Sequence, residues 1–354
     1  MWKLSLLGLA GLLLLPPASR SAEPVALNRV RREVLQYLDA SRVAGRPPGG
    51  FRARPGAAGG VTLYAACDAA IIRAVMGEDL ASTLTATERA AWVEQILAFA
   101  RPDGSFGPAR RGHGLEHANG TVIGALGLLG GRQLRPVRFY ESFDGPDEVG
   151  PWLDSLDWSR PWRGAHRVWG GPFCYSLSRR CDPAWRDAAF AWLDAELDSS
   201  SGWWRRGVFP QEAHASLGGA AHIWPFYQQH GRRFPYPERV IDSILRMQKP
   251  DGCWLEYGSY LELDALYGLV LMGSHAPGYR RVEILTAARR HGAELTARWP
   301  SWLAREPDLH DLLAVVGTFG LLQQLLPGEY VDEARWTDIF SDPRLCRTAA
   351  VEAP

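Results

Sequence analysis

The stretch QKPDGCW, residues 248–254, has a close copy in ARPDGSF, residues 100–106. In both, Pro-Asp-Gly is typical of a tight turn, and an aromatic residue stands two positions after the glycine. Weaker copies are DWSRPW at 157–162 and DSSSGWW at 198–204. The aromatic residues of the four copies are spaced by roughly 40 to 55 residues, a period that suits a pair of helices with its connections. The sequence therefore predicts a helical repeat architecture.

Two kinds of helix are expected to alternate around these turns. The helix before a turn is amphipathic: residues 85–99 open with the capping box Thr85-x-x-Glu88 and continue with apolar residues on one face. The helix after a turn is apolar nearly all round and rich in Gly and Ala, which indicates burial with close backbone contacts. The ends of the chain repeat the pattern, with amphipathic segments at 25–40 and 280–298 and apolar segments at 61–76 and 309–326.

Six such pairs, each with an outer amphipathic and an inner apolar helix, predict an all-α fold, an (α/α)6 toroid of six outer/inner helix hairpins. We expect a single toroid domain over residues 22–336 and an irregular surface tail over 337–354. Residues 1–21 read as a signal peptide, because a lysine is followed by a roughly 12-residue apolar run and then by prolines and small residues. The run is short for a membrane span, so we expect a secreted or periplasmic protein with no stable membrane span.

The amino-acid composition limits the kinds of ligand that the protein is expected to bind. Basic and acidic residues balance at 39 each, which argues against nucleic acid as a ligand. The five cysteines include no CxxC pair and are odd in number, so a disulfide scaffold is not expected. The sequence Asn119-Gly-Thr is a glycosylation sequon if the source is eukaryotic. A small molecule or a glycan is the expected ligand.

The turn Gln248-x-x-Asp251-Gly252-x-Trp254 resembles the repeat of the squalene cyclase and protein prenyltransferase toroids. The resemblance implies the α/α toroid fold, and it covers most of the chain as a pattern, although only the turns at 248–254 and 100–106 are close. The acidic runs with which the cyclases protonate, and the Asp-x-Cys pair with which the prenyltransferases bind zinc, are absent. The resemblance therefore implies a fold and leaves the reaction open.

In such a toroid the inner helices are parallel, so their N-termini gather at one end of the central cavity. Polar residues are frequent at these positions, and six of the nine histidines lie within or just before a predicted inner helix. Helix N-capping accounts for the presence of acidic residues at helix starts, but it does not account for several histidines at these positions. The predicted catalytic residues are His117, His166, His214, Glu262, Asp264 and His310. The predicted substrate-binding residues are Glu116, Asn119, Trp169, Tyr260 and Asp311.

Imidazoles facing carboxylates can do acid–base chemistry near neutral pH, or they can hold a metal ion. His117, His214 and His310 are the candidate ligands, and a divalent ion such as zinc is the candidate cofactor. Aromatic residues, imidazoles and carboxylates in an exported toroid favour an enzyme acting on a glycan, of lyase or hydrolase type. Two alternatives stay open: a terpenoid-cyclase or prenyltransferase-like enzyme on a nonpolar substrate, and a non-catalytic secreted ligand-binding toroid.

Overall fold

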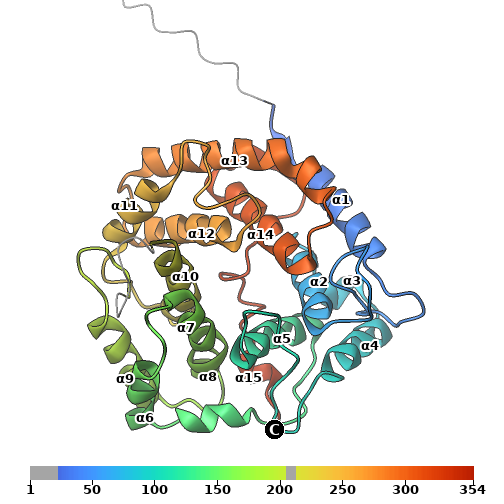
Figure 1. Ribbon diagram of the computed structural model, residues 1–354, viewed down its shortest axis with the longest axis horizontal. Coiled ribbons are helices and arrows are strands. Elements are labelled where there is room, and N and C mark those ends of the chain that lie inside the picture. The colour runs from blue at the N-terminus through green and yellow to red at the C-terminus, as the bar shows by residue number, and fades with distance from the viewer. Residues whose placement is uncertain (1–22, 205–212) are drawn as a thin grey trace, which may run out of the picture.

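The computed structural model describes residues 23–204 and 213–354 (Figure 1). The all-α prediction is confirmed in its coarse form, since the described chain is mostly helical. The β-structure in named strands is a two-residue parallel pair, β1 (Val25–Ala26) and β2 (Tyr330–Val331). Among the described residues, no helix is long and apolar enough to cross a membrane. The predicted signal peptide, 1–21, lies outside the described residues.

Six buried helices form the centre of the molecule. Each contacts the next in chain order, and the last contacts the first, so the contacts make a closed circuit. Five of them are apolar nearly all round, whereas α7 buries one face and carries arginines on the other, and the six surround the middle of the view in Figure 1. The six are α2 (Leu63–Val75), α5 (Leu115–Leu129), α7 (Pro161–Val168), α10 (Ala213–Gln229), α12 (Tyr260–His275) and α14 (Leu309–Leu325).

Helix α7 runs on through a π-helical turn, η2 (Trp169–Phe173), into the short α8 (Cys174–Ser176). A Pro-containing π turn is consistent with a local break in the regular hydrogen-bond ladder. The segment behaves as one inner element, because both α7 and η2 contact α5 and α10.

Amphipathic helices lie at the periphery of Figure 1 and cover the inner ones with their apolar faces. The predicted capping box of Thr85 and Glu88 is present, and Asp182 caps a helix that opens with Pro183. The peripheral helices are α1 (Leu27–Ala40), α4 (Ala86–Leu97), α6 (Pro146–Asp154), α9 (Pro183–Ala195), α11 (Pro237–Met247) and α13 (Arg281–Leu303). Shorter elements are α3 (Leu80–Thr83), η1 (Arg138–Ser142) and α15 (Thr348–Val351).

The two close sequence copies form the same turn. The backbone N–H of Ser105 donates to Asp103 Oδ1 at 3.1 Å, and that of Cys253 donates to Asp251 Oδ1 at 3.0 Å. Gly104 and Gly252 have φ values of +78° and +86°, in the left-handed region that favours glycine. The sequence repeat is therefore a structural repeat at the level of the turn.

The C-terminal segment 337–354 contains one short helix, α15, and has buried as well as exposed residues. Trp336 is fully buried and Phe340 is 3% exposed. The backbone N–H of Thr337 donates to the Val75 carbonyl at 2.8 Å, at the C-terminal end of α2, and Gln229 at the end of α10 donates to the Phe340 carbonyl at 3.3 Å. The segment thus packs against the C-terminal ends of inner helices. The last carbonyl groups of a helix have no hydrogen-bond partner within the helix, so they need donors from elsewhere in the chain.

Candidate functional site

A polar cavity of about 550 Å³ lies where inner helices begin. His117 and His310 stand in the first turns of α5 and α14, and Tyr260 opens α12. Aromatic rings and charged side chains both line its wall, which suits a polar ligand with flat apolar faces. The lining residues are Arg110, His113, His117, Trp162, His166, His222, Glu256, Tyr257, Gly258, Ser259, Tyr260, Trp302, Arg305, Pro307, His310 and Asp311.

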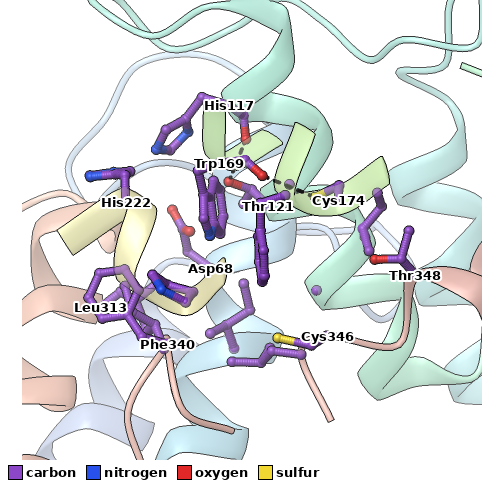
Figure 2. A pocket seen from close by; sticks show the side chains of 18 of the residues that line it. Asp68, His117, Thr121, Trp169, Cys174, His222, Leu313, Phe340, Cys346 and Thr348 are labelled. Carbon is purple, nitrogen blue, oxygen red and sulfur yellow. Dashed lines mark hydrogen bonds between the residues drawn. The ribbon is translucent and has the colours of Figure 1, made fainter. Parts of the chain in front are cut away.

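A second, smaller cavity of about 50 Å³ lies behind the first (Figure 2). Four side chains line both cavities and therefore form the partition between them: His117, His222, Tyr260 and His310. The inner cavity is mainly apolar, and Phe340 and Cys346 of the C-terminal segment stand on its far side (Figure 2). The inner wall of the polar cavity therefore consists largely of histidine side chains.

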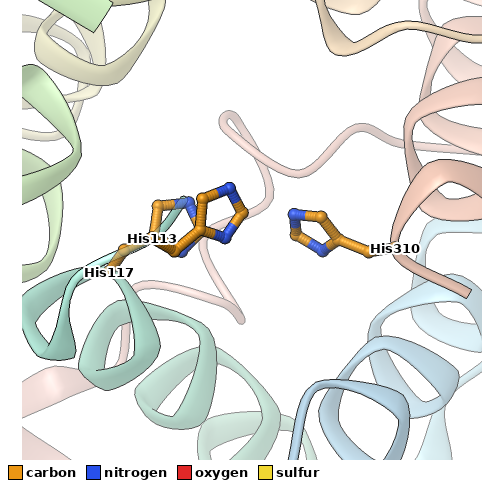
Figure 3. Close-up of side chains that lie close together, drawn as sticks. All are labelled: His113, His117 and His310. Atoms are coloured by element: carbon orange, nitrogen blue, oxygen red, sulfur yellow. The ribbon is translucent and has the colours of Figure 1, made fainter. Parts of the chain in front are cut away.

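Five histidines converge at this wall. The ring of His117 lies at the centre, with its centroid 4.1 Å from that of His113, 4.7 Å from His166, 5.9 Å from His222 and 6.0 Å from His310. Figure 3 shows His113 and His117 facing His310 across the middle of the molecule. We call these five residues the histidine cluster. They come from the start of α5 and from α7, α10 and α14, so the cluster depends on the fold.

Close backbone contact places two of these rings. Gly170, in η2, packs against the first turn of α5, and a Cβ at this position would lie 1.5 Å from the carbonyl oxygen of Glu116. Only glycine can occupy such a position. The contact brings α7, with His166, against the turn that carries His117. The glycine four residues after His166 is therefore a packing requirement of the cluster.

Tyrosines and one carboxylate contact the imidazoles. The hydroxyl of Tyr64, in α2, is 2.9 Å from Nδ1 of His117. Nδ1 of His310 lies 3.2 and 3.3 Å from the two carboxylate oxygens of Asp68 and 3.2 Å from the hydroxyl of Tyr260. The carboxylate of a buried residue thus lies against the histidine that closes the cluster, an arrangement that fixes the orientation of a ligand imidazole.

Burial lowers the pKa of four of the five imidazoles, those of His113, His117, His166 and His222. It lowers the pKa of His113 to about 3 and, together with neighbouring imidazoles, lowers the pKa of His117 and His166 far below the usual range. Burial likewise lowers the pKa of His222 to about 4. Burial raises the pKa of Asp68, and the neighbouring His310 acts in the opposite direction. Neutral imidazoles have free lone pairs, the form in which histidine binds metals.

The nitrogens are close enough together to share an ion. One nitrogen each from His113, His117 and His310 lie within 4.8 Å of one another, and so do nitrogens of His117, His166 and His222. Nδ1 of His113 and Nδ1 of His166 are buried and have no hydrogen-bond partner among the described residues. Three histidine nitrogens at this spacing fit a divalent transition ion, which takes three protein ligands in catalytic sites. His117 belongs to both sets.

The structure brings several predicted site residues together. His117, His166 and His310 are in the cluster, Tyr260 contacts it, and the Trp169 ring lies 5.1 Å from that of His117. Two predicted carboxylates lie beside the cluster and pair with arginines. Glu116 accepts from Arg167 at 2.8 Å, and Asp311 lies 3.2 Å from Arg110 on the wall of the polar cavity.

Three predicted catalytic residues do not join the cluster. Nε2 of His214 lies 2.9 Å from the carbonyl oxygen of Trp254. The carboxylate of Glu262 accepts backbone N–H groups of Trp254 and Leu255 at 2.8–3.1 Å, so it stabilises the turn before its own helix. Asp264 is fully buried, and burial raises its pKa well above the usual range. None of the three lines the polar or the inner cavity.

Asn119 has a packing role. Its side chain is fully buried and donates to the Tyr140 hydroxyl at 3.1 Å and to the Gly170 carbonyl at 3.0 Å, while Gln133 donates to its oxygen at 3.3 Å. The amide of the sequon is therefore used inside the fold, and in this conformation it is not accessible to a glycan.

Three residues of the site, His113, His222 and Asp68, are not among the predicted catalytic and substrate-binding residues. His113 has the spacing of a ligand pair with His117, but the glycines on either side argue against a helix there, and the structure places it in the turn that precedes α5. His222 lies eight residues after His214 along α10, and Asp68 lies one turn after Tyr64 on α2. The excess of histidines in the inner helices was the signal available for His222.

Comparison with known proteins adds no family to these observations: no protein-family model, curated protein or solved structure matches the chain. The site must therefore be interpreted from its own chemistry.

Proposed function

We propose that the chain is an exported (α/α)6 toroid enzyme that binds a divalent transition ion in the histidine cluster and acts on a glycan in the polar cavity. The observation that carries the proposal is the convergence of five histidines on the inner wall of one polar cavity. The closed circuit of contacts among the six buried helices supports the toroid, and the signal-like residues 1–21 support export.

The cluster would hold the ion through His117 with either His113 and His310 or His166 and His222. When bound, such an ion would polarise a ligand oxygen or lower the pKa of a water molecule. Asp68 orients the His310 ring, and the Tyr64 and Tyr260 hydroxyls fix the positions of His117 and His310. Burial lowers the pKa of His113 and of His222, which disfavours their protonation and leaves lone pairs available to bind the ion.

The wall of the polar cavity supports a glycan as the ligand. Trp162, Tyr257 and Trp302 offer flat apolar surfaces, and the Tyr257 and Trp302 ring centroids are 5.7 Å apart. Arg110 and Arg305 offer donors for hydroxyl or carboxylate groups on the same wall. A sugar has one relatively apolar face and a polar rim, so the combination of rings and charges matches it.

The test is turnover by the mature protein, loaded with zinc or manganese, on a panel of uronate-containing and neutral polysaccharides. Elimination creates a carbon–carbon double bond that absorbs in the ultraviolet, whereas hydrolysis creates reducing ends without that absorbance. We expect turnover that requires the ion and is lost in His117→Ala but kept in His275→Ala, a matched histidine at the far end of α12.

Absence of turnover on the whole panel with loaded protein would overturn the glycan assignment. Saturable glycan binding without turnover would support the ligand-binding alternative. Turnover on a prenyl substrate would support the cyclase-like alternative, for which the mainly apolar inner cavity is the one favourable observation.

A further inference from the structure

We infer that Cys253, Glu262 and His291 form a second metal site, which ties the turn at 249–255 to α12 and α13. The Cys253 sulfur, a Glu262 oxygen and a His291 nitrogen lie within 4.8 Å of one another. The three residues come from the turn, from α12 and from α13, so an ion bound among them would join three segments of the chain. This site lies apart from the histidine cluster, since none of the three residues lines either cavity.

The three side chains are buried, and among the described residues no lysine or arginine forms an ion pair with Glu262, although Lys249 and Arg298 act on the site from farther away. Cys253 and Glu262 are each 1% exposed, and His291 is fully buried. Burial raises the pKa of Glu262 to about 7 and that of Cys253 to about 12, and Glu262 adds to the shift on Cys253. Burial also lowers the pKa of His291 to about 4, so its ring is neutral and does not act as the counter-ion. A bound cation would offset the burial of a carboxylate and a thiolate together.

His291 has an unused lone pair. Its Nδ1 lies 3.2 Å from the Gly252 carbonyl oxygen and 3.3 Å from a Glu262 oxygen, and its Nε2 is buried with no hydrogen-bond partner among the described residues. A neutral imidazole carries one N–H, so one of its two nitrogens has a free lone pair. A buried polar nitrogen without a partner costs free energy, so this imidazole is not fully satisfied by the described residues.

The turn itself does not require this set of residues. In the equivalent turn, Ser105 occupies the position of Cys253 and makes the same backbone hydrogen bonds. At 198–204, Ser200 donates its backbone N–H to Asp198 at 2.8 Å in the same manner. A thiol facing a buried carboxylate and an imidazole is therefore an additional feature of the turn at 249–255.

Sulfur, nitrogen and oxygen donors together favour zinc. In tetrahedral zinc sites with bonds of about 2.0–2.3 Å the ligand atoms lie roughly 3.6 Å apart, so the cluster would contract by about 1 Å at most. Glu294, three residues after His291 on α13, contributes to the electrostatic field at Cys253 and forms an ion pair with Arg298.

The experiment is metal analysis of the tag-free mature protein, purified without chelators, followed by reconstitution with Co²⁺. The variants are Cys253→Ser, His117→Ala and the control Cys181→Ser, which replaces a cysteine outside the cluster. We expect wild type to bind one equivalent more than Cys253→Ser. We also expect Co²⁺-loaded wild type to show a thiolate-to-cobalt charge-transfer band that persists in His117→Ala and Cys181→Ser and is lost in Cys253→Ser.

Equal metal content in wild type and Cys253→Ser, or absence of the thiolate band from Co²⁺-loaded wild type, would overturn the inference. If Cys253→Ser does not fold, His291→Gln serves instead, because it keeps the thiol and should shift or abolish the band. The result is independent of the histidine cluster. An ion lost only in His117→Ala would contradict the second site alone, and an ion lost only in Cys253→Ser would contradict the proposed function alone.

Discussion

The carboxylate of Asp68 lies 3.2 Å from Nδ1 of His310, and the aspartate is fully buried. A carboxylate in this position holds the proton of the imidazole on Nδ1 and leaves the Nε2 lone pair free. Asp68 comes from α2 and His310 from α14, so the contact joins the first and last inner helices of the circuit. It also makes Asp68 a positioning residue for the histidine cluster.

Asp68→Asn should weaken metal binding at the cluster by about 10- to 100-fold, because the amide cannot hold the His310 tautomer as a carboxylate does. The measurement is competition for Zn²⁺ against a chelator of known affinity. Asp311→Asn is the matched control: it removes a carboxylate from the cavity wall that pairs with Arg110 and does not contact an imidazole. Equal losses in both variants would mean that only the general charge of the cavity matters.

His117→Ala should abolish binding at the cluster, since His117 belongs to both sets of nitrogens, whereas His214→Ala should leave it unchanged. His214 instead contacts the Trp254 carbonyl, so its loss should lower the free energy of unfolding by about 1 kcal/mol. Metal titration and urea unfolding of the two variants check both statements. Loss of the cluster ion in His214→Ala would favour the sequence-based ligand set over the structural one.

Gly170→Ala should destabilise the protein by about 3 kcal/mol, because its Cβ would overlap the Glu116 carbonyl at the contact of η2 with α5. Gly171→Ala is the neighbouring control, as its Cβ would meet the Phe143 ring at an ordinary 3.4 Å. Thermal unfolding in the presence of a chelator compares the two variants without a contribution from bound metal. Similar midpoints for both would contradict the proposed close contact.

The free energy of unfolding of the metal-free protein should fall at acidic pH, because buried histidines of the cluster bind protons more weakly in the folded chain than in the unfolded one. The pKa of His222 is about 4 in the folded chain and near 6.5 in an unfolded one, so the unfolded state binds more protons at low pH. The contribution is fully present above pH 6.5 and is lost as the pH falls towards 4, by ~3 kcal/mol for this residue alone. Urea unfolding from pH 7 to 4 should show a shallower loss for His222→Asn than for wild type. Parallel curves would exclude His222 as a source of the acid sensitivity.

The helices could be predicted because their signals are local. The capping box of Thr85 and Glu88 and the Asp182-Pro183 start mark helix N-termini by side-chain chemistry alone. The all-apolar segments identify the buried helices, since a helix that is apolar on every face can be stable only inside. The burial of Phe340 has no signal in the sequence, because this residue is an isolated aromatic in an irregular segment without periodicity.

The cluster could be predicted only in part, because it depends on how far each side chain lies along its helix. His117 and His310 stand in the first turns of α5 and α14, but in α10 the cluster takes His222, more than two turns beyond His214. Glu262 was misleading for a physical reason: a carboxylate at a helix start can also satisfy the N–H groups of the preceding turn.

Anomalous diffraction at the zinc edge, from crystals of the mature protein grown with excess Zn²⁺, tests the central claim most directly. The account predicts a peak within about 2.0–2.1 Å of imidazole nitrogens of the cluster, with His117 among the ligands. The companion ligands would show whether His113 and His310 or His166 and His222 complete the site. Zinc-saturated crystals with no peak beside His117 would contradict the account.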